Sequence, residues 1–178
     1  GSLLLPRGYL KKLLSKNIQF EIEDHRVIHP KIQLPEIKLR DYQIPFLEAI
    51  LKDDQGMGLA PPGAGKTVIG LGIYSRLGQP CLWLTHTSRL LAQTKDRAEK
   101  FLGIEVGTYG KGKKNLQHFT VGLIQTLIRR DLEEIKEMFS LIIVDECHHI
   151  PSATLDEIVN FLPGKYRYGL TATAYRDD

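Results

Sequence analysis

The most informative segment of the chain is Ala60-Pro61-Pro62-Gly63-Ala64-Gly65-Lys66-Thr67. It follows an apolar run that predicts a strand at 57–60, and it opens a pattern that predicts a helix at 66–77. Gly63 and Gly65 permit a tight turn that brings successive backbone N–H groups to phosphate oxygens, and the helix N-terminus adds a partial positive charge. A glycine-rich turn in this context is typical of a phosphate-binding loop.

This segment predicts a site for a nucleotide with Mg²⁺. Lys66 would reach the β- and γ-phosphates, and the Thr67 hydroxyl would be a ligand of the metal ion. The residues around the phosphates would be Pro62, Gly63, Ala64 and Gly65. The strict motif has Gly at the position of Ala60, so the chain matches a looser form of it. The structural alternative is a glycine-rich turn that binds no ligand.

Two adjacent acids, Asp145 and Glu146, follow the apolar run at 141–144. This run predicts a buried strand, and open α/β sheets bind ligands at the carboxyl ends of their strands. We expect Asp145 to hold Mg²⁺ through water and Glu146 to orient and deprotonate the attacking water. The alternative is a solvated strand end that caps the next helix. The tripeptide Cys147-His148-His149 would suit zinc, but the sequence has no second ligand cluster at matching spacing, so we predict no zinc site.

Predicted strands and helices alternate from about Leu39 to the end of the chain. This alternation indicates an α/β fold with a doubly wound, mainly parallel sheet. The expected strands are 57–60, 81–85, 105–109, 119–122, 141–145 and 166–171, and the expected helices are 42–52, 66–77, 88–101, 132–138 and 154–161. We therefore expect one domain at 39–178, preceded by an extension at 1–38. In this extension, Gly1-Ser2 looks like a cloning scar, 6–16 has basic helical spacing, and 18–23 alternates like a half-buried strand.

Composition narrows the class of protein. The chain has 178 residues, of which 42% are hydrophobic and 25% charged, as in an ordinary globular domain. Its apolar runs are far shorter than the roughly 18 residues of a membrane span, so we expect no membrane partner. Two cysteines cannot form a disulfide framework, which favours a cytoplasmic location. The net charge of +3 permits a nucleic-acid partner without requiring one.

Taken in order, these motifs resemble those of superfamily 2 helicases and translocases. Asp145-Glu146-Cys147-His148 is similar to the DExH form of their acidic motif, and Leu39-Arg40-Asp41-Tyr42-Gln43 resembles the segment that reads adenine. The resemblance implies a RecA-like fold and ATP hydrolysis with Mg²⁺. It places Lys66, Asp145, Glu146 and His148 in the catalytic site. It also implies that Gln43 hydrogen-bonds the base and that Arg40 packs beside it.

Three further segments resemble motifs that bind or sense nucleic acid. They are 85–93, in which Thr87 and Gln93 match the motif, then 124–127 with Gln125 and Thr126, and 169–174 with Thr171 and Thr173. The first two imply contacts with nucleic acid, with DNA favoured over RNA, and the third implies coupling between nucleotide state and nucleic-acid binding. XPB-like proteins and the motor subunits of type I and type III restriction enzymes are the most similar groups.

The resemblance implies a partner lobe and a motor function. A second RecA-like lobe, expected beyond residue 178, would supply an arginine finger, so we expect the chain alone to hydrolyse ATP slowly. Besides a helicase or translocase, the alternatives are a translocating subunit of a restriction or repair complex, a small-molecule kinase, and a non-enzymatic nucleotide-binding module. The basic turn at 111–114 predicts either phosphate contacts or a solvated hairpin, and Arg129-Arg130 is equally open.

Overall fold

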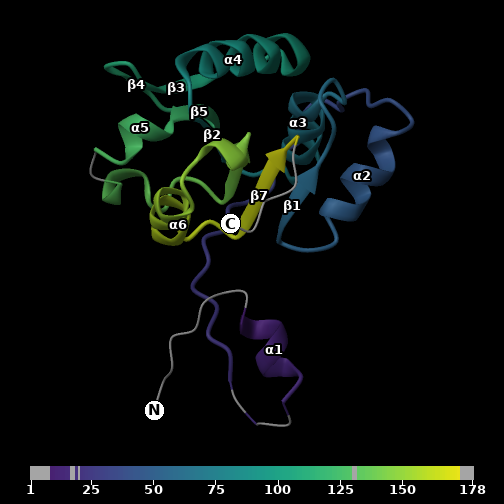
Figure 1. The fold of residues 1–178 in the computed structure, drawn as a ribbon, viewed down its shortest axis with the longest axis vertical. Helices are drawn as coiled ribbons and strands as arrows, with labels where there is room; N and C mark the ends of the chain where they lie inside the picture. Colours follow the sequence, from purple (N-terminus) through teal and green to yellow (C-terminus); the bar gives the residue numbers. More distant parts are fainter. Residues whose placement is uncertain (1–8, 17–18, 20, 130–131, 173–178) are drawn as a thin grey trace.

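The computed structural model describes residues 9–16, 19, 21–129 and 132–172. Its centre is one seven-stranded sheet in the order β1-β7-β6-β2-β5-β3-β4 (Figure 1). Neighbouring strands pair in parallel, except that β3 and β4 form an antiparallel hairpin. The strands are Gln55–Leu59 (β1), Cys81–Thr85 (β2), Gly107–Gly110 (β3), Lys113–Asn115 (β4), Phe119–Leu123 (β5), Leu141–Asp145 (β6) and Tyr166–Thr171 (β7). The predicted α/β fold with a mainly parallel sheet is confirmed.

Among the described residues, five helices cover the two faces of this sheet: Gln43–Ile50 (α2), Lys66–Leu77 (α3), Ser88–Leu102 (α4), Ile124–Leu127 (α5) and Ser152–Phe161 (α6). Leu10–Leu14 (α1) stands apart from the sheet (Figure 1). Cys81 and Trp83 of β2 face the core shared with α2, α3 and α4, whereas Leu82 and Leu84 face the core shared with α5 and α6. Because successive side chains of a strand point to opposite faces, a strand covered on both sides is apolar throughout.

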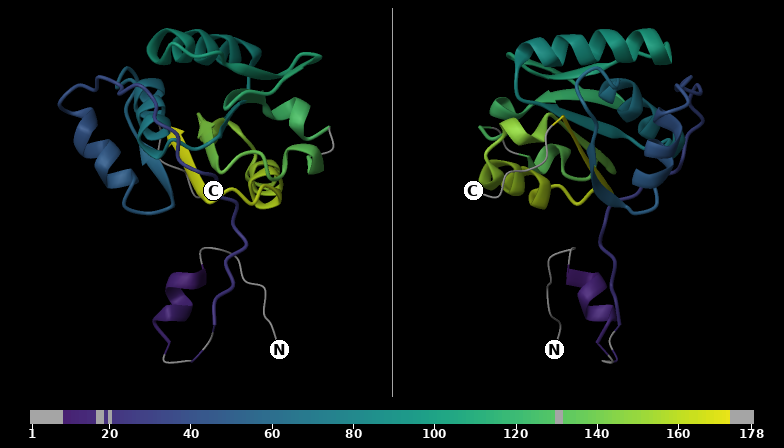
Figure 2. Two further views of the ribbon diagram at one scale, coloured as in Figure 1. Left: turned by 180° about the vertical axis from the view of Figure 1, so that it is seen from behind. Right: turned by 45° about the vertical axis from the view of Figure 1, so that its right-hand side comes forward.

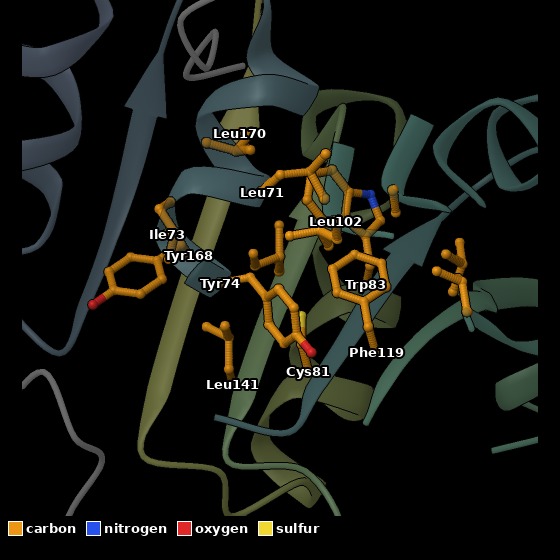
Figure 3. Packing of buried hydrophobic residues seen from close by; sticks show 14 of the residues in the cluster. Leu71, Ile73, Tyr74, Cys81, Trp83, Leu102, Phe119, Leu141, Tyr168 and Leu170 are labelled. Atoms are coloured by element: carbon orange, nitrogen blue, oxygen red, sulfur yellow. The ribbon is translucent and has the colours of Figure 1, made fainter. Parts of the chain in front are cut away.

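Trp83 lies in the middle of the larger core (Figure 3). Its ring centroid is 5.9 Å from that of Phe119, and Tyr74 of α3 meets Phe119 edge to face at 4.8 Å. Gly70 of α3 lies directly over the indole, where an added Cβ would come within 2.5 Å of a ring carbon. The missing side chain lets α3, which begins at the phosphate loop, lie close to the sheet.

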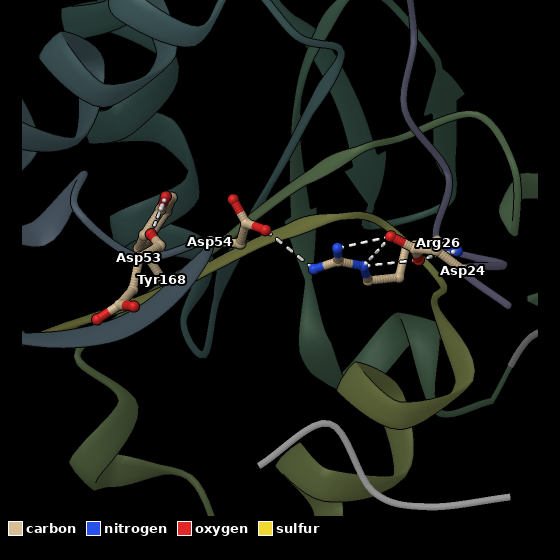
Figure 4. A network of polar contacts seen from close by, with 5 residues as sticks. All are labelled: Asp24, Arg26, Asp53, Asp54 and Tyr168. Atoms are coloured by element: carbon tan, nitrogen blue, oxygen red, sulfur yellow. Dashed lines mark hydrogen bonds and ion pairs between the residues drawn. The ribbon is translucent and has the colours of Figure 1, made fainter. Parts of the chain in front are cut away.

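The segment before α2 is tied to the lobe by charge and by backbone contacts. Arg26 donates hydrogen bonds to Asp24 at 2.8 Å and to Asp54, just before β1, at 3.0 Å (Figure 4). Val27 forms a β-bridge with Gly164, next to β7. We call the trio Asp24, Arg26 and Asp54 the arginine clasp. It holds part of the N-terminal segment against the end of the sheet where β1 begins.

Two predicted elements are wrong: the strand at 18–23 in the N-terminal segment and the helix at 132–138 before β6. Within the described part of 18–23, Gln19 and residues 21–23 form no strand, and Ile22 is 55% exposed. This segment stands apart from the sheet beside α1, where it has no strand edge to pair with (Figures 1 and 2). The predicted helix at 132–138 is only a 3₁₀ turn at Glu133–Ile135.

The basic turn at 111–114 is a hairpin turn between β3 and β4. Lys111 and Gly112 both have positive φ, 52° and 74°, which is the backbone geometry of tight hairpins. β4 was not among the predicted strands, since its three residues are exposed and polar. The predicted strand at 105–109 begins only at Gly107. The basic residues of this turn therefore lie at the β4 edge of the sheet.

Candidate nucleotide-binding site

The phosphate loop connects β1 to α3 and takes its shape from two glycines. Gly63 and Gly65 have φ values of 81° and 79°, a left-handed region in which other residues are strained. Gly65 is also the residue that precedes the first turn of α3. A Cβ at this position would lie 2.5 Å from Gln43 Nε2, so Gly65 is needed for its backbone and for its small size.

Gln43 and its neighbours support the loop from α2. The buried Gln43 side chain donates from Nε2 to Ala64 O at 2.8 Å and accepts at Oε1 from the Arg40 backbone N–H at 3.0 Å. Arg40 also donates to Tyr42 Oη at 3.1 Å. The sequence motif predicted that Gln43 hydrogen-bonds the adenine base. The contact of Gln43 with the loop was missed, because the sequence carries no signal for it.

A pocket of about 400 Å³ opens beside this contact. Its walls are mostly apolar and come from α2, the end of β1 and the phosphate loop: Tyr42, Phe46, Leu59, Ala60, Pro61, Pro62, Ala64 and Ile69. Such an apolar pocket next to a phosphate-binding turn can hold a planar ring while the turn holds charged groups.

The phosphate loop and the acidic motif meet, although 80 residues separate Lys66 from Glu146. Only β7 lies between β1 and β6 in the sheet. Lys66 Nζ is 2.8 Å from Glu146 Oε1, with side-chain exposures of 12% and 21%. Glu146 has φ 51°, an uncommon value for a residue other than glycine, immediately after β6. This turn directs its carboxylate toward the lysine.

Asp145 lies at the end of β6 and is 5% exposed. Burial, followed by the charge of Glu146, raises the pKa of Asp145 to about 6, and Lys66 opposes the shift. A buried carboxylate is costly to ionise without a cation nearby. Asp145 and the Thr67 hydroxyl together offer the oxygen ligands that Mg²⁺ prefers, so the residues present fit this ion.

Thr67 has a partner that sequence reasoning missed. Its Oγ1 accepts a hydrogen bond from Arg97 Nη1 at 3.2 Å. Arg97 lies on the exposed side of α4, where an arginine at helical spacing resembles any solvated residue.

The end of β7 contacts both loops through consecutive peptides. Ala60 N–H donates to Thr171 O at 2.9 Å, and Glu146 N–H donates to Leu170 O at 2.8 Å. The Thr171 hydroxyl is also hydrogen-bonded to His148 Nδ1 at 2.6 Å. Burial, followed by the charge of His149, lowers the pKa of His148. Thr173, the other residue expected in this motif, lies outside the described residues.

The four candidate nucleic-acid residues follow the carboxyl ends of β2 and β5, which are neighbours in the sheet. Thr87 precedes α4 and accepts from the Leu90 N–H, while Gln93 is exposed on α4. Gln125 of α5 donates from Nε2 to His86 O at 3.0 Å, and Thr126 beside it is partly exposed. Thr87, Gln125 and Thr126 therefore lie at the sheet edge that carries the phosphate loop and the acids, whereas Gln93 lies in the second turn of α4.

A family model described as "Type III restriction enzyme, res subunit" (ResIII) matches residues 36–176. The chain belongs to the ResIII family. The match includes the phosphate loop, the two acids at the end of β6 and the end of β7. The chain is thus a RecA-like lobe of the superfamily 2 helicase type, as its motifs predicted.

Curated relatives of this ResIII chain include helicases and a translocase. It is 36% identical over 174 residues to "DNA 3'-5' translocase XPB2" of Sulfurisphaera tokodaii, covering 97% of this chain and 39% of that protein. It is 30% identical over 177 residues to "Probable helicase D10" of Escherichia phage T5, covering 98% of this chain and 39% of that protein. The chain thus spans about two fifths of the length of these relatives.

Solved structures share the fold of this ResIII chain. The UvsW helicase of bacteriophage T4 superimposes with a TM-score of 0.64 at 19% identity, covering 95% of this chain and 61% of that one. A Sulfolobus solfataricus SWI2/SNF2 ATPase core, solved with dsDNA, gives 0.65 at 22% identity over 80% of this chain and 35% of that one. In the part of the ResIII chain that the structure describes, no helix has the length and apolar character to span a membrane.

Proposed function

We propose that this ResIII lobe binds and hydrolyses ATP with Mg²⁺, as the nucleotide-binding half of a motor that acts on DNA. The observation that carries the proposal is the ion pair between Lys66 and Glu146. It brings the cation of the phosphate loop to the proposed base, with the buried Asp145 beside it. No other arrangement in the described residues joins a phosphate-binding turn to a pair of carboxylates.

The chain's own residues would divide the work as follows. Backbone N–H groups at 63–67 and Lys66 bind the phosphates, and Lys66 exchanges the Glu146 carboxylate for the γ-phosphate. Glu146, once released, accepts the proton of the attacking water. Thr67 and Asp145 would hold Mg²⁺, which supplies charge neutralisation at the phosphates. The adenine base would occupy the apolar pocket beside Gln43, and Arg40 would pack beside the adenine.

DNA is the proposed nucleic-acid partner because the relatives that match along most of this chain include a protein named as a DNA translocase. Thr87, Gln93, Gln125 and Thr126 would bind the backbone of the strand, and Thr171 and Thr173 would relay the nucleotide state. A second RecA-like lobe of the same protein would complete the ATP site. The alternative is a motor that translocates along DNA without unwinding it. The relative named as a DNA translocase supports this alternative as much as it supports a helicase.

Binding of a fluorescent ATP analogue to the 178-residue chain tests the nucleotide site. We expect Glu146→Gln to bind the analogue and Lys66→Ala to lose binding at least about tenfold, because a charge-assisted contact to phosphate is worth about 1.5–3 kcal/mol. Lys52→Ala, at an exposed lysine after α2, is the matched control and should bind as the wild type does. Equal affinity of the Lys66→Ala and wild-type chains would disprove the site.

Turnover separates the proposed roles further. In the whole protein, ATP hydrolysis should rise on addition of double-stranded DNA and be abolished by Glu146→Gln. A Glu146→Gln protein that hydrolysed ATP at the wild-type rate would refute its assignment as the base. ATPase activity indifferent to DNA would leave the nucleotide site in place and refute the motor.

A further inference from the structure

A second group of potential ligands lies beside the ATP site. Glu146, His148 and His149 each offer one ligand atom, and these atoms all lie within 4.8 Å of one another. The rings of His148 and His149 are 3.9 Å apart between centroids. The ring of His86, which follows β2, is 5.1 Å from that of His149. The sequence shows no second ligand cluster, but β2 and β6 are neighbours in the sheet, so the fold places His86 beside this group.

Two atoms of this group are buried without a hydrogen bond. Among the described residues, neither Glu146 Oε2 nor His86 Nδ1 has a hydrogen-bond partner. Glu146 Oε1 forms an ion pair with Lys66, whereas Glu146 Oε2 lies 3.3 Å from His148 Nδ1. Unsatisfied buried polar atoms are costly, and a bound ion is one of the few ways to satisfy a carboxylate oxygen and an imidazole nitrogen together.

The chemistry of the group selects a class of ion. Neutral imidazole and carboxylate suit zinc and its transition-metal neighbours, whereas Mg²⁺ prefers oxygen ligands alone. We propose that Glu146, His148 and His149, with His86, bind a divalent transition-metal ion such as Zn²⁺. Such binding removes the Glu146 carboxylate from ATP hydrolysis. The inhibition rests on the proposed function, but the metal site does not.

For Glu146, His148 and His149, the geometry requires only small movements. Bonds of 2.0–2.1 Å place the ligand atoms of a tetrahedral zinc site about 3.4 Å apart. The present separations, up to 4.8 Å, can close by side-chain rotation, since His149 is exposed and Glu146 and His148 are only partly buried. Cys147 is not a ligand in this arrangement, because its buried thiol faces Gly169 of β7.

Titration of the 178-residue chain with Co²⁺, without nucleotide, tests the site by its visible absorption spectrum. We expect the intense bands of a four-coordinate ion, lost on addition of Zn²⁺ as zinc displaces cobalt. His149→Asn and His86→Asn should each weaken Co²⁺ binding at least about tenfold, the loss typical even of outer-shell changes. His25→Asn is the matched control, since it removes an exposed histidine outside the group. Weak six-coordinate bands, or equal affinity in all four chains, would overturn the proposal.

The effect on turnover is measured separately in the whole protein. Micromolar Zn²⁺ should inhibit ATP hydrolysis in the presence of excess Mg²⁺, and a zinc-selective chelator should restore it. The His149→Asn protein should keep its activity without zinc and need at least about ten times more zinc for half inhibition. Equal zinc sensitivity of the wild type and His149→Asn would refute inhibition at this site. If cobalt binds as expected but the protein hydrolyses no ATP, the proposed function fails and the metal site stands.

Discussion

At the scale of single residues, the proposed ATP site depends on side chains that hold each other before any ligand is present. Glu146 adopts a left-handed backbone conformation and pairs with Lys66, so the proposed base and the proposed phosphate-binding cation are already adjacent. Strained backbone of this kind persists only where surrounding contacts enforce it. Here the enforcing contact is the hydrogen bond from Glu146 N–H to Leu170 O.

Gln43 gives a prediction at this scale. Gln43→Ala removes the hydrogen bond to Ala64 O and leaves the Arg40 N–H without its acceptor. With each such bond worth about 0.5–1.5 kcal/mol, we expect the dissociation constant of an ATP analogue to rise about tenfold. Fluorescence titration of the chain measures it. Gln33→Ala changes an exposed glutamine and should have no effect. Unchanged affinity in Gln43→Ala would show that the loop keeps its shape without this support.

At the scale of elements, α3 is the support of the phosphate loop, and its position depends on Gly70. A larger residue at 70 would push the helix away from the Trp83 ring. The higher helix propensity of alanine opposes this effect only weakly, because Ala is favoured over Gly in a helix by only about 1 kcal/mol.

We therefore predict opposite effects for two glycines of α3. Gly70→Ala should lower the free energy of unfolding by about 1–3 kcal/mol, as overpacking of a core does. Gly72→Ala should be neutral or stabilising, since its Cβ would lie 3.4 Å or more from Leu47 and Leu39. Urea unfolding followed by fluorescence of the single tryptophan, Trp83, measures both. Equal stability of the two variants would contradict the packing described for Gly70.

At the scale of the whole molecule, the arginine clasp joins the N-terminal segment to the lobe. Arg26 bonds Asp24 on one side and Asp54 on the other, and its hydrogen bond holds the pKa of Asp24 well below the usual range. A carboxylate with a depressed pKa contributes stability above its unfolded pKa of about 3.9 and loses it as the pH falls.

The clasp predicts a pH-dependent difference in stability. Arg26→Ala should lower the melting temperature at pH 7 by a small amount, since partly exposed ion pairs are worth roughly 0–1 kcal/mol. The difference in melting temperature from the wild type should narrow below about pH 4, because Asp24 of the unfolded chain takes up a proton there while the folded state keeps it ionised. Calorimetry across this range measures it, with Arg76→Ala, at an exposed arginine of α3, as control. A gap that widened in acid would contradict the assigned role of Asp24.

The elements that the sequence predicted well are those with local signals. β2 and β6 are unbroken apolar runs, and the phosphate loop is marked by its glycines, so each could be recognised alone. The sequence did not reveal that β4 is a strand or that 18–23 is not one. Strand formation there depends on whether a neighbouring strand edge is available for pairing. The contacts of Gln43 with Ala64 and of His86 with His149 join residues from different elements, and no spacing along the chain reports them.

The place of β7 between β1 and β6 has a mechanical consequence. Its last two carbonyls each accept one N–H, the first from the turn with Glu146 and the second from the start of the phosphate loop. A small shift of this strand end would therefore move both halves of the proposed ATP site together. In this lobe, movement would pass through rigid main chain, with no need for a sequence of side-chain rearrangements.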